Sequence, residues 1–513
     1  MGLRHIVEDS GMYEMELDWL KKWDMYSPQG VALLDGETDH QLTYAELYKK
    51  AKQAAAYLKN QFQISKGDRV AVMATNELEH VVLLFACQRL GAILIPVNFR
   101  LTPREVAHIL KDSSPKLFLY QNDYEGLVQE LSAHVALPAK AFFTGEGSFF
   151  SAAYSHIEEY AKFDGMTQDP CMIIYTSGTT GAPKGALLSN SMLFWNSINT
   201  TLRLNINQSD CFVSFLPFFH TGGFNVLTTP YLHRGAKVVV VKKFDADRIL
   251  ELSAKHKATL LFGVPTTMDL LSQSPLFASA DLSSIRYAIV GGEPMPIKLI
   301  EKWHEKKIPI RQGYGLTEFG PNVFSLNEQD AIRKKGSIGF PNFYIEAKVV
   351  DDNNSEVGNE EVGELVLKGP SCMLGYWNNL EATAKTIVDG WLHTGDLVRK
   401  DSEGYFYVVG RKKDMYKSGG ENVYPPELEQ VLRQMPEIKE AAVIGVKDEK
   451  WGEVGRAFIV AAAPNLTEEL VLKFCQSNLA KFKIPKYFTF VKELPKGESG
   501  KILKRQLPEL YPL

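Results

Sequence analysis

The segment YTSGTTGAPKG, residues 175–185, concentrates residue types that bind phosphate. Glycine lets a backbone approach phosphate oxygens closely, while exposed backbone N–H groups, hydroxyls and the ammonium group of Lys184 can hold them. A P-loop has a different order, because its lysine follows the last glycine directly and a hydroxyl residue comes next. Here Pro183 precedes the lysine and Gly185 follows it. The segment therefore predicts a polyphosphate-binding loop and argues against a P-loop kinase or GTPase.

The residues that flank this loop predict how it is held. The apolar run MIIY, residues 172–175, is typical of a buried strand, and NSMLFWNSI, residues 190–198, can form a helix. This predicts a strand–loop–helix setting for the loop. Short β-rich runs alternate with helical segments as far as about residue 337. Such alternation favours an α/β fold with layered, largely parallel sheets.

The pattern of residue types along the sequence changes twice beyond residue 337. Residues 343–369 are typical of strands joined by a polar turn, which predicts a small β-rich lobe. The connector GRKKDMYKSGG, residues 410–420, is basic and contains glycine, and helix and strand patterns follow it. We therefore expect a large multi-lobed N-terminal domain over residues 1–410 and a small, mobile α+β C-terminal domain over residues 411–513.

Composition narrows the class of protein. The chain has 513 residues, 45% hydrophobic and 23% charged, with a net charge of −4, so no broad nucleic-acid surface is expected. Its five cysteines are dispersed, which argues against a disulfide framework or a zinc site. The apolar stretch 81–97 is too short to span a membrane and reads as a helix followed by a strand. No signal peptide is recognised, and we expect a cytoplasmic protein without stable membrane insertion.

Several segments resemble, in order, the signature motifs of the adenylate-forming superfamily. This family includes acyl-CoA synthetases, firefly luciferase and the adenylation domains of peptide synthetases. The resemblance covers essentially the whole chain. The segments are YTSGTTGAPKG (175–185), YGLTE (314–318), GELVLKGPSCMLGYWNN (363–379), GWLHTGDL (390–397), GRKKDMYKSGGENVYPPELE (410–429) and PKGESGKILK (495–504).

The resemblance implies an AMP-forming acid–CoA ligase. In such an enzyme a carboxylate attacks the α-phosphorus of ATP, pyrophosphate leaves, and the thiol of coenzyme A then displaces AMP from the acyl-AMP. ATP and coenzyme A are implied as co-substrates and Mg²⁺ as the cofactor, because the two anions that react need neutralising cations. The alternative kept open is a ligase that loads the acyl group onto the phosphopantetheine thiol of a carrier protein.

The same resemblance implies an ATP site. Tyr314 is expected to offer a flat face to adenine, Asp396 to accept hydrogen bonds from the ribose hydroxyls, and Arg411 to help hold ribose and phosphate. Thr317 is placed to contact the α-phosphate. The residues expected to bind ATP are Thr176, Ser177, Gly178, Thr179, Thr180, Gly181, Lys184, Gly292, Glu293, Pro294, Tyr314, Gly315, Thr317, Asp396 and Arg411.

Three residues are assigned catalytic roles by the resemblance. Lys501 matches the lysine that bridges the reacting carboxylate and the α-phosphate, although Glu498 stands where many relatives have a small or hydroxyl residue. Glu318 is expected to bind the magnesium ion. His220 matches a position close to the reacting carboxylate.

A moving C-terminal domain is also implied. Lys413 occupies the hinge position, about which the small domain rotates between adenylation and thioester formation. In the second state the stretch containing Lys417, Ser418, Gly419 and Gly420 is expected to line the pantetheine tunnel, where glycine permits close backbone approach.

The acid itself is only partly predicted. Residues 212–236 are rich in phenylalanine, and no aspartate lies between 212 and 232 to hold the ammonium group of an amino acid. This favours a hydrophobic acid, fatty or aryl. Chain length, pathway and oligomeric state stay open, and a luciferase-like oxidation would use the same motifs.

Overall fold

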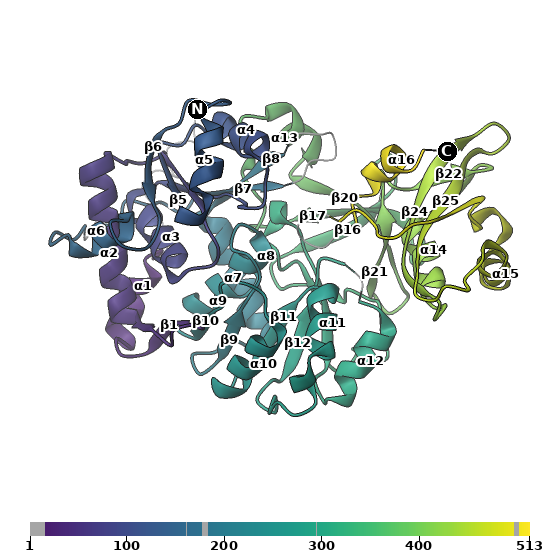
Figure 1. Ribbon diagram of the computed structural model, residues 1–513, viewed down its shortest axis with the longest axis horizontal. Helices are drawn as coiled ribbons and strands as arrows, with labels where there is room; N and C mark the ends of the chain where they lie inside the picture. The colour runs from purple at the N-terminus through teal and green to yellow at the C-terminus, as the bar shows by residue number, and fades with distance from the viewer. Residues whose placement is uncertain (1–15, 161, 177–182, 294, 497–501, 513) are drawn as a thin grey trace, which may run out of the picture.

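Residues 16–160, 162–176, 183–293, 295–496 and 502–512 are described by a computed structural model of the protein, shown in Figure 1. Two large sheets form the body of the N-terminal part, and a smaller sheet joins them to the C-terminal part. The α/β class expected from the sequence is confirmed. In the described part of the chain, no helix is both long and apolar enough to cross a membrane.

The first large sheet has seven strands within the described residues, and its central strands are parallel. Leu78–Leu90 forms helix α3 and Ile93–Pro96 the strand β4, so the helix and strand expected around residues 81–97 are confirmed. The strands in spatial order are β18 (Gly375–Tyr376), β8 (Lys184–Ser189), β7 (Pro170–Thr176), β4, β3 (Arg69–Met73), β5 (Leu117–Tyr120) and β6 (Ala139–Phe142).

The second large sheet has nine strands in the described ranges; β13, β12, β11, β9, β10 and β1 are parallel neighbours, and β2 pairs antiparallel with β1 at one edge. Its last two neighbours, β14 and β15, pair antiparallel. The strands in spatial order are β15 (Phe340–Pro341), β14 (Phe324–Ser325), β13 (Ile310–Tyr314), β12 (Tyr287–Val290), β11 (Leu260–Gly263), β9 (Cys211–Ser214), β10 (Lys237–Val240), β1 (Val31–Asp35) and β2 (Gln41–Thr43).

Alternate residues of the strands divide the hydrophobic core into layers, because successive side chains of a strand point to opposite faces. In β3, Val70 and Val72 join the central core, whereas Ala71 and Met73 join a separate outer core. The central core is shared by both sheets and the helices α2 (Tyr44–Phe62), α3 and α7 (Asn190–Leu204). The outer faces pack on α4 (Pro103–Ser113) and α5 (Glu125–Leu131), and on α10 (Ala246–Lys255), α11 (Pro265–Gln273) and α12 (Ile297–Glu305).

The small β-rich lobe expected from the sequence is present, and its sheet is antiparallel. It contains β16 (Glu346–Val350), β17 (Val362–Lys368), β19 (Ile387–Val388), β20 (Trp391–Lys400) and β21 (Phe406–Arg411).

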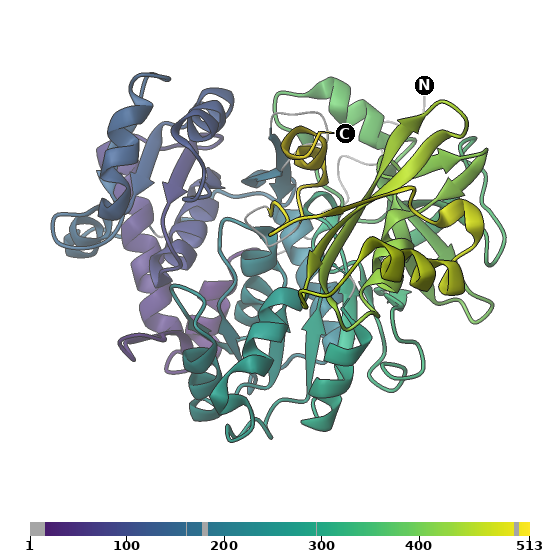
Figure 2. The same cartoon turned by 45° about the vertical axis from the view of Figure 1, so that its right-hand side comes forward.

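The C-terminal part has a sheet and apolar cores of its own. Its strands are β22 (Tyr416–Ser418), β23 (Glu421–Val423), β24 (Ile438–Asp448), β25 (Gly452–Ala461) and β26 (Tyr487–Phe490), packed against α14 (Pro425–Leu432) and α15 (Glu468–Asn478). Figures 1 and 2 both show this part beside the small lobe, at one end of the molecule.

Candidate functional site

The expected phosphate loop connects two antiparallel strands. Thr176 at the end of β7 lies opposite Lys184 at the start of β8, and the Thr176 hydroxyl donates to the Lys184 carbonyl at 3.4 Å. The expected helix, α7, does begin at Asn190, but the strand β8 lies between the loop and this helix. The predicted strand–loop–helix setting was therefore wrong: the order is strand, loop, strand, helix. The apolar residues of β8 extend the sheet before the helix begins. The predicted residues Ser177, Gly178, Thr179, Thr180 and Gly181 lie outside the described residues.

Lys184 and Glu318 are linked through one tyrosine that sequence reasoning did not single out. Tyr376 of β18 is brought beside β8, where it lies opposite Ala186. The Lys184 Nζ lies 5.3 Å from the centre of the Tyr376 ring, and the Tyr376 hydroxyl donates to Glu318 Oε1 at 2.9 Å. Burial, and secondly the Glu318 carboxylate, raises the pKa of Tyr376, so the phenol stays a donor. Tyr376 lies inside a family-like motif, which was the signal available.

A second cluster joins Tyr314, Asp396 and Arg411. The Tyr314 hydroxyl donates to Asp396 Oδ2 at 2.6 Å, and Arg411 Nε lies 2.6 Å from Asp396 Oδ1. Asp396 and Arg411 are direct neighbours in the β20–β21 pairing, which fixes their separation. Burial, and secondly Asp396, raises the pKa of Tyr314. Asp396 is 4% exposed whereas the Arg411 side chain is 40% exposed, so the pair presents its positive side outward.

A glutamate that the sequence analysis did not single out contacts the residues next to Asp396 and Arg411. Glu364 of β17 accepts a hydrogen bond from the Gly395 N–H at 3.1 Å and pairs with Lys412 Nζ at 3.2 Å. The residues it holds are the direct neighbours of Asp396 and Arg411. Glu364 lies in the quoted segment 363–379, but nothing in its spacing distinguished it from a surface glutamate.

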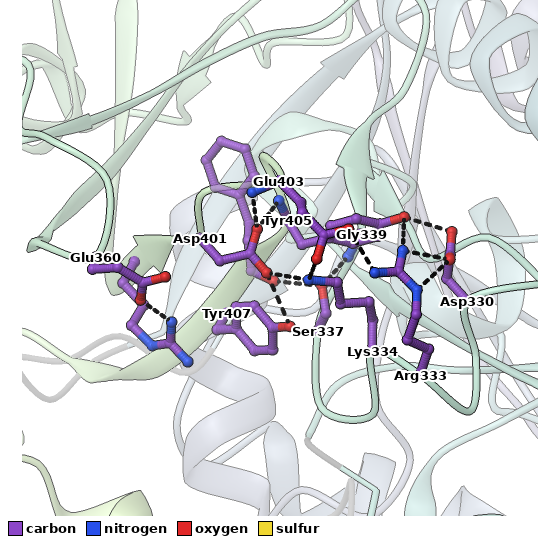
Figure 3. Close-up of polar contacts among 12 residues, drawn as sticks. Asp330, Arg333, Lys334, Ser337, Gly339, Glu360, Asp401, Glu403, Tyr405 and Tyr407 are labelled. Carbon is purple, nitrogen blue, oxygen red and sulfur yellow. Dashed lines mark hydrogen bonds and ion pairs between the residues drawn. The ribbon is translucent and has the colours of Figure 1, made fainter.

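The β20–β21 hairpin is also anchored to the body by a network of charges (Figure 3). Lys334 Nζ lies 2.7 Å from Asp401 Oδ2 and 2.7 Å from Glu403 Oε1. Asp330 pairs with Arg333 at 2.8 Å and accepts a hydrogen bond from the Tyr405 hydroxyl. The network therefore ties the turn of the hairpin to the segment that follows β14.

The YGLTE segment and the segment around residue 292 lie side by side. Val290 of β12 pairs with Gln312 of β13, so the residues after each strand emerge at the same edge of the sheet. Gly292 has a φ of +84°, which favours glycine. A Cβ on Gly315 would lie 1.8 Å from the Pro321 carbonyl oxygen, so only glycine fits there. Thr317 is buried, and Glu293 follows Gly292, while Pro294 lies outside the described residues.

His220 is attached to the YGLTE region by two asparagines. It precedes α8 (Thr221–Asn225), whose last residue accepts a hydrogen bond from Asn196 Nδ2 at 2.7 Å. Asn322, four residues after Glu318, donates to the Val226 carbonyl at 2.9 Å and, from its backbone N–H, to Asn196 Oδ1 at 3.3 Å. These buried amide contacts fix the His220 helix relative to the Glu318 segment.

The imidazole of His220 is exposed, yet surrounding protein atoms lower its pKa by disfavouring the charged form, and Arg100 lowers it further. Phe219 is adjacent, and Phe99 and Tyr124 continue the aromatic cluster at centroid distances of 5.3 and 5.6 Å. Many other phenylalanines of residues 212–236 belong to the core instead: Phe215, Phe218 and Phe224.

The hinge and tunnel residues lie at the start of the C-terminal part. Lys413 is exposed between β21 and β22, after Lys412, which is bound to the small lobe, and before Tyr416, which is buried in the C-terminal core. Lys417 is exposed and Ser418 buried, and Gly419 and Gly420 form the turn to β23 with φ of +61° and +90°. Lys501 lies outside the described residues.

Comparisons with known proteins agree with this architecture. Residues 20–377 match the model of the AMP-binding enzyme family, and residues 427–501 match that of the AMP-binding enzyme C-terminal domain. A feruloyl-CoA synthase of Amycolatopsis sp is 36% identical over 490 residues, 95% of this chain and 97% of the relative. An indoleacetate–CoA ligase of Aromatoleum aromaticum is 36% identical over 503 residues, 97% and 98%. A long-chain-fatty-acid–CoA ligase of Mycobacterium tuberculosis is 34% identical over 486 residues, 94% and 96%.

Among solved structures, ATP-bound MatB from Rhodopseudomonas palustris is similar with a TM-score of 0.90 and 32% identity, covering 97% of this chain and 99% of that one. The apo structure of MatB covers the same shares at 32% identity but has a TM-score of 0.78.

The fold, the clustered residues and the family models together define the class: the chain belongs to the AMP-binding enzyme family, the adenylate-forming superfamily. Within it, the chain is of the acyl-CoA synthetase type, an AMP-forming acid–thiol ligase.

Proposed function

We propose that this enzyme activates a hydrophobic carboxylic acid with ATP and passes the acyl group to coenzyme A, with aryl acids preferred to straight-chain fatty acids. The observation that carries the nucleotide part is the Tyr314–Asp396–Arg411 cluster, which combines a buried carboxylate with a partly exposed guanidinium. The aromatic cluster beside His220 supports the acid class, since aromatic faces favour stacking. The feruloyl-CoA synthase and the indoleacetate–CoA ligase, each 36% identical, are named for acids that carry an aromatic ring. The coenzyme A acceptor, rather than a carrier protein, follows the relatives' names.

The nucleotide would be held from several sides. Asp396 accepts from the ribose hydroxyls, Tyr314 faces the adenine, and Gly292, Glu293 and Pro294 lie along the other side of the base. Arg411 contacts ribose and phosphate, and Thr317 the α-phosphate. The loop ending at Lys184 takes the β- and γ-phosphates; its members Thr176, Ser177, Gly178, Thr179, Thr180 and Gly181 supply hydroxyls and backbone N–H groups. Gly315 permits the tight turn that places Thr317 and Glu318.

Magnesium fits Glu318. Among the described residues no group of three or more His, Cys, Asp or Glu side chains could form a metal cage. Mg²⁺ is instead held typically by one or two carboxylates together with substrate phosphates and waters. Glu318, oriented by Tyr376 and near Lys184, meets that description. When bound, the ion would neutralise charge on the phosphates.

The remaining residues act on the acid and on the second half-reaction. His220 is neutral at pH 7 because its pKa is lowered, so it can position the acid's carboxylate by a hydrogen bond without a fixed charge. Lys501 neutralises the carboxylate and α-phosphate as they meet. The C-terminal domain, residues 411–513, then turns about Lys413, which brings Lys417, Ser418, Gly419 and Gly420 to the pantetheine. Lys413 is exposed and lies between a residue bound to the small lobe and one bound to the C-terminal core, as a hinge position requires.

We place the enzyme in the cytoplasm. ATP and coenzyme A are supplied there, and all five cysteines are free thiols, as a reducing compartment requires.

The test combines an acid panel with separated half-reactions. The protein is incubated with ATP, Mg²⁺, coenzyme A and acids from acetate through long fatty acids to benzoate- and cinnamate-type acids, and products are identified by mass spectrometry. We expect acyl-CoA and AMP, with kcat/KM highest for an aryl acid. Acyl-AMP without thioester would overturn the acceptor, and a fatty acid at the top would overturn the acid class. Lys501→Ala should lose acyl-AMP formation yet still make thioester from synthetic acyl-AMP; equal loss of both would refute the two-state assignment.

A further inference from the structure

A second concentration of positive charge lies in a cavity apart from the residues assigned to the nucleotide. The cavity has a volume of about 340 Å³ and is lined by Arg203, Arg311, Asn327, Glu328 and Gln329. None of these residues belongs to a motif that the family resemblance assigned to ATP, acid or coenzyme A.

The elements that build the cavity fix its two arginines. Arg311 is the second residue of β13, and it donates from Nε to the Leu326 carbonyl at 2.9 Å. Arg203 stands in the last turn of α7 and donates from Nη2 to the Ser325 carbonyl at 3.0 Å and to Asn327 Oδ1 at 2.6 Å. Arg311 Nη2 also reaches the Arg203 backbone carbonyl at 3.4 Å. Both guanidinium groups are therefore held in place by neutral oxygens.

Neither arginine has a carboxylate within ion-pair distance among the residues that the structure describes. Arg311 is only 5% exposed, and its guanidinium carbon lies 4.5 Å from the centre of the Tyr287 ring. The nearby Asp330 is occupied by Arg333 and Tyr405, and the Glu328 side chain is exposed. Burial, and secondly the Arg311 charge, lowers the pKa of Arg203. Arg311 is buried and Arg203 half-buried, and the carboxylate that lines the cavity, Glu328, is exposed and beyond ion-pair distance of both. Two like charges this close and so weakly compensated favour binding of an anion.

The donors left over define the ligand's chemistry. In the described structure Arg203 uses only Nη2 for hydrogen bonds, and Arg311 uses Nε and Nη2. The other guanidinium N–H groups remain for the cavity. Guanidinium groups pair with tetrahedral oxyanions through two parallel hydrogen bonds, and two of them match the double charge of a phosphate. The single acidic side chain of the lining, Glu328, disfavours a large polyanion.

We propose that this cavity binds a small phosphate-class oxyanion, inorganic phosphate or pyrophosphate. The bound anion would join the end of α7, the start of β13 and the segment after β14. Because β13 continues to Tyr314, the anion would also stiffen the strand that carries the adenine-side residue.

The experiment uses the full chain with its nucleotide site filled by saturating AMP and without Mg²⁺. Sodium phosphate or sodium pyrophosphate is titrated at an ionic strength held constant with sodium chloride, and the Tm is followed. We expect the Tm of the wild type to rise by about 2 °C at saturation. Arg203→Gln should lose the rise, and Arg203→Lys should need about tenfold more anion. The matched control Arg433→Gln, an exposed arginine of the C-terminal domain, should keep the full rise.

Each outcome decides the proposal. A rise that depends on Arg203 supports it, and the anion that acts at lower concentration names the ligand. A Tm that does not respond to either anion overturns it, as does a rise that Arg203→Gln retains. The Tm increase caused by AMP alone, measured on every variant, shows that Arg203→Gln remains folded.

Discussion

Arg311 lies in β13, the strand that ends at Tyr314, and Arg411 is paired across strands with Asp396, which accepts a hydrogen bond from Tyr314. The two arginines nevertheless differ in burial and in their charged partners. Arg411 Nε lies 2.6 Å from a buried carboxylate, and its side chain is 40% exposed. Arg311 is almost fully buried, bonds to a backbone carbonyl, and has no carboxylate within ion-pair distance among the described residues; Arg203 lies beside it, and Glu328 acts on it only from a longer distance. The carboxylate of Asp396 compensates the charge of Arg411 on one side, and the other side of the guanidinium is open to a ligand. Arg203 and Arg311, which lie side by side with no carboxylate within ion-pair distance in the described structure, favour binding of an anion.

The largest effect is expected from the substitution that removes the counter-charge of Arg411. Asp396→Asn would leave Arg411 without its carboxylate, as Arg311 is, and would take away the charged acceptor proposed for the ribose hydroxyls. We expect ATP affinity to fall about 100-fold, or about 2.7 kcal/mol, measured by calorimetry. The control Asp352→Asn removes an exposed carboxylate that pairs with Lys412 on the same lobe, and should change affinity less than twofold. Unchanged affinity in Asp396→Asn would dissociate the cluster from the nucleotide.

A smaller effect, on the rate of pyrophosphate release, is expected when Glu318 loses the tyrosine that orients it. Tyr376→Phe removes the hydroxyl that donates to Glu318, so the carboxylate loses its orientation. We expect the rate of pyrophosphate release to fall about tenfold and the Mg²⁺ concentration for half-maximal rate to rise. Tyr407→Phe, which removes a longer bond to Asp401 at 3.4 Å, serves as the matched control. A lower rate without any change in Mg²⁺ dependence would mean that Tyr376 has only a structural role.

The difference between the two arginine sites can also be reduced by placing a carboxylate close to Arg203 and Arg311. Gln329→Glu adds a carboxylate to the lining of the cavity. We expect phosphate to bind about fivefold more weakly, measured as the concentration that gives half of the Tm rise. Gln434→Glu makes the same change on an exposed part of the C-terminal domain and should have no effect on it. Equal phosphate binding in both variants would contradict the role given to the missing counter-charge.

The smallest effect concerns Asp330, the carboxylate that Arg333 and Tyr405 keep from the arginine pair. Hydrogen bonds from the Tyr405 hydroxyl, then from Arg333, lower the pKa of Asp330 to about 2. A lowered pKa in the folded state adds stability above the unfolded value near 4, and this stability is lost as pH falls toward 2. Asp330→Asn should therefore flatten the decline of Tm between pH 4 and pH 2, by a small amount because the site is near solvent. An identical pH profile would show that other carboxylates account for the decline.

Much of the architecture was predictable because it depends on local pattern. The alternation of apolar strands and helices predicted the α/β class, and the strand patterns joined by a polar turn within residues 343–369 predicted the small β-rich lobe. The structure added that its strands pair antiparallel. The setting of the phosphate loop was wrong because the apolar run after Lys184 suits a strand as well as a helix start. In the fold this run pairs with β7 on one side and with β18 on the other, and these hydrogen bonds make it the strand β8.

The candidate site was predictable only where a motif carried it. Tyr314, Asp396 and Arg411 were named from motifs, and the structure brings them within hydrogen-bond distance. Tyr376, Glu364 and Asn322 were missed, because a tyrosine, a glutamate and an asparagine have many uses. Their partners are distant in the chain, and only folding brings them close.

The sequence alone determined the layered α/β class, the family and the order of its motifs, since these depend on residue type and spacing along the chain. The tertiary structure decided which charges meet. It paired Asp396 with Arg411 across adjacent strands and Asp330 with Arg333. It left Arg203 and Arg311 beside each other with no carboxylate within ion-pair distance in the described structure. Electrostatic interactions depend on distance and burial in three dimensions, and neither is written in the spacing of residues.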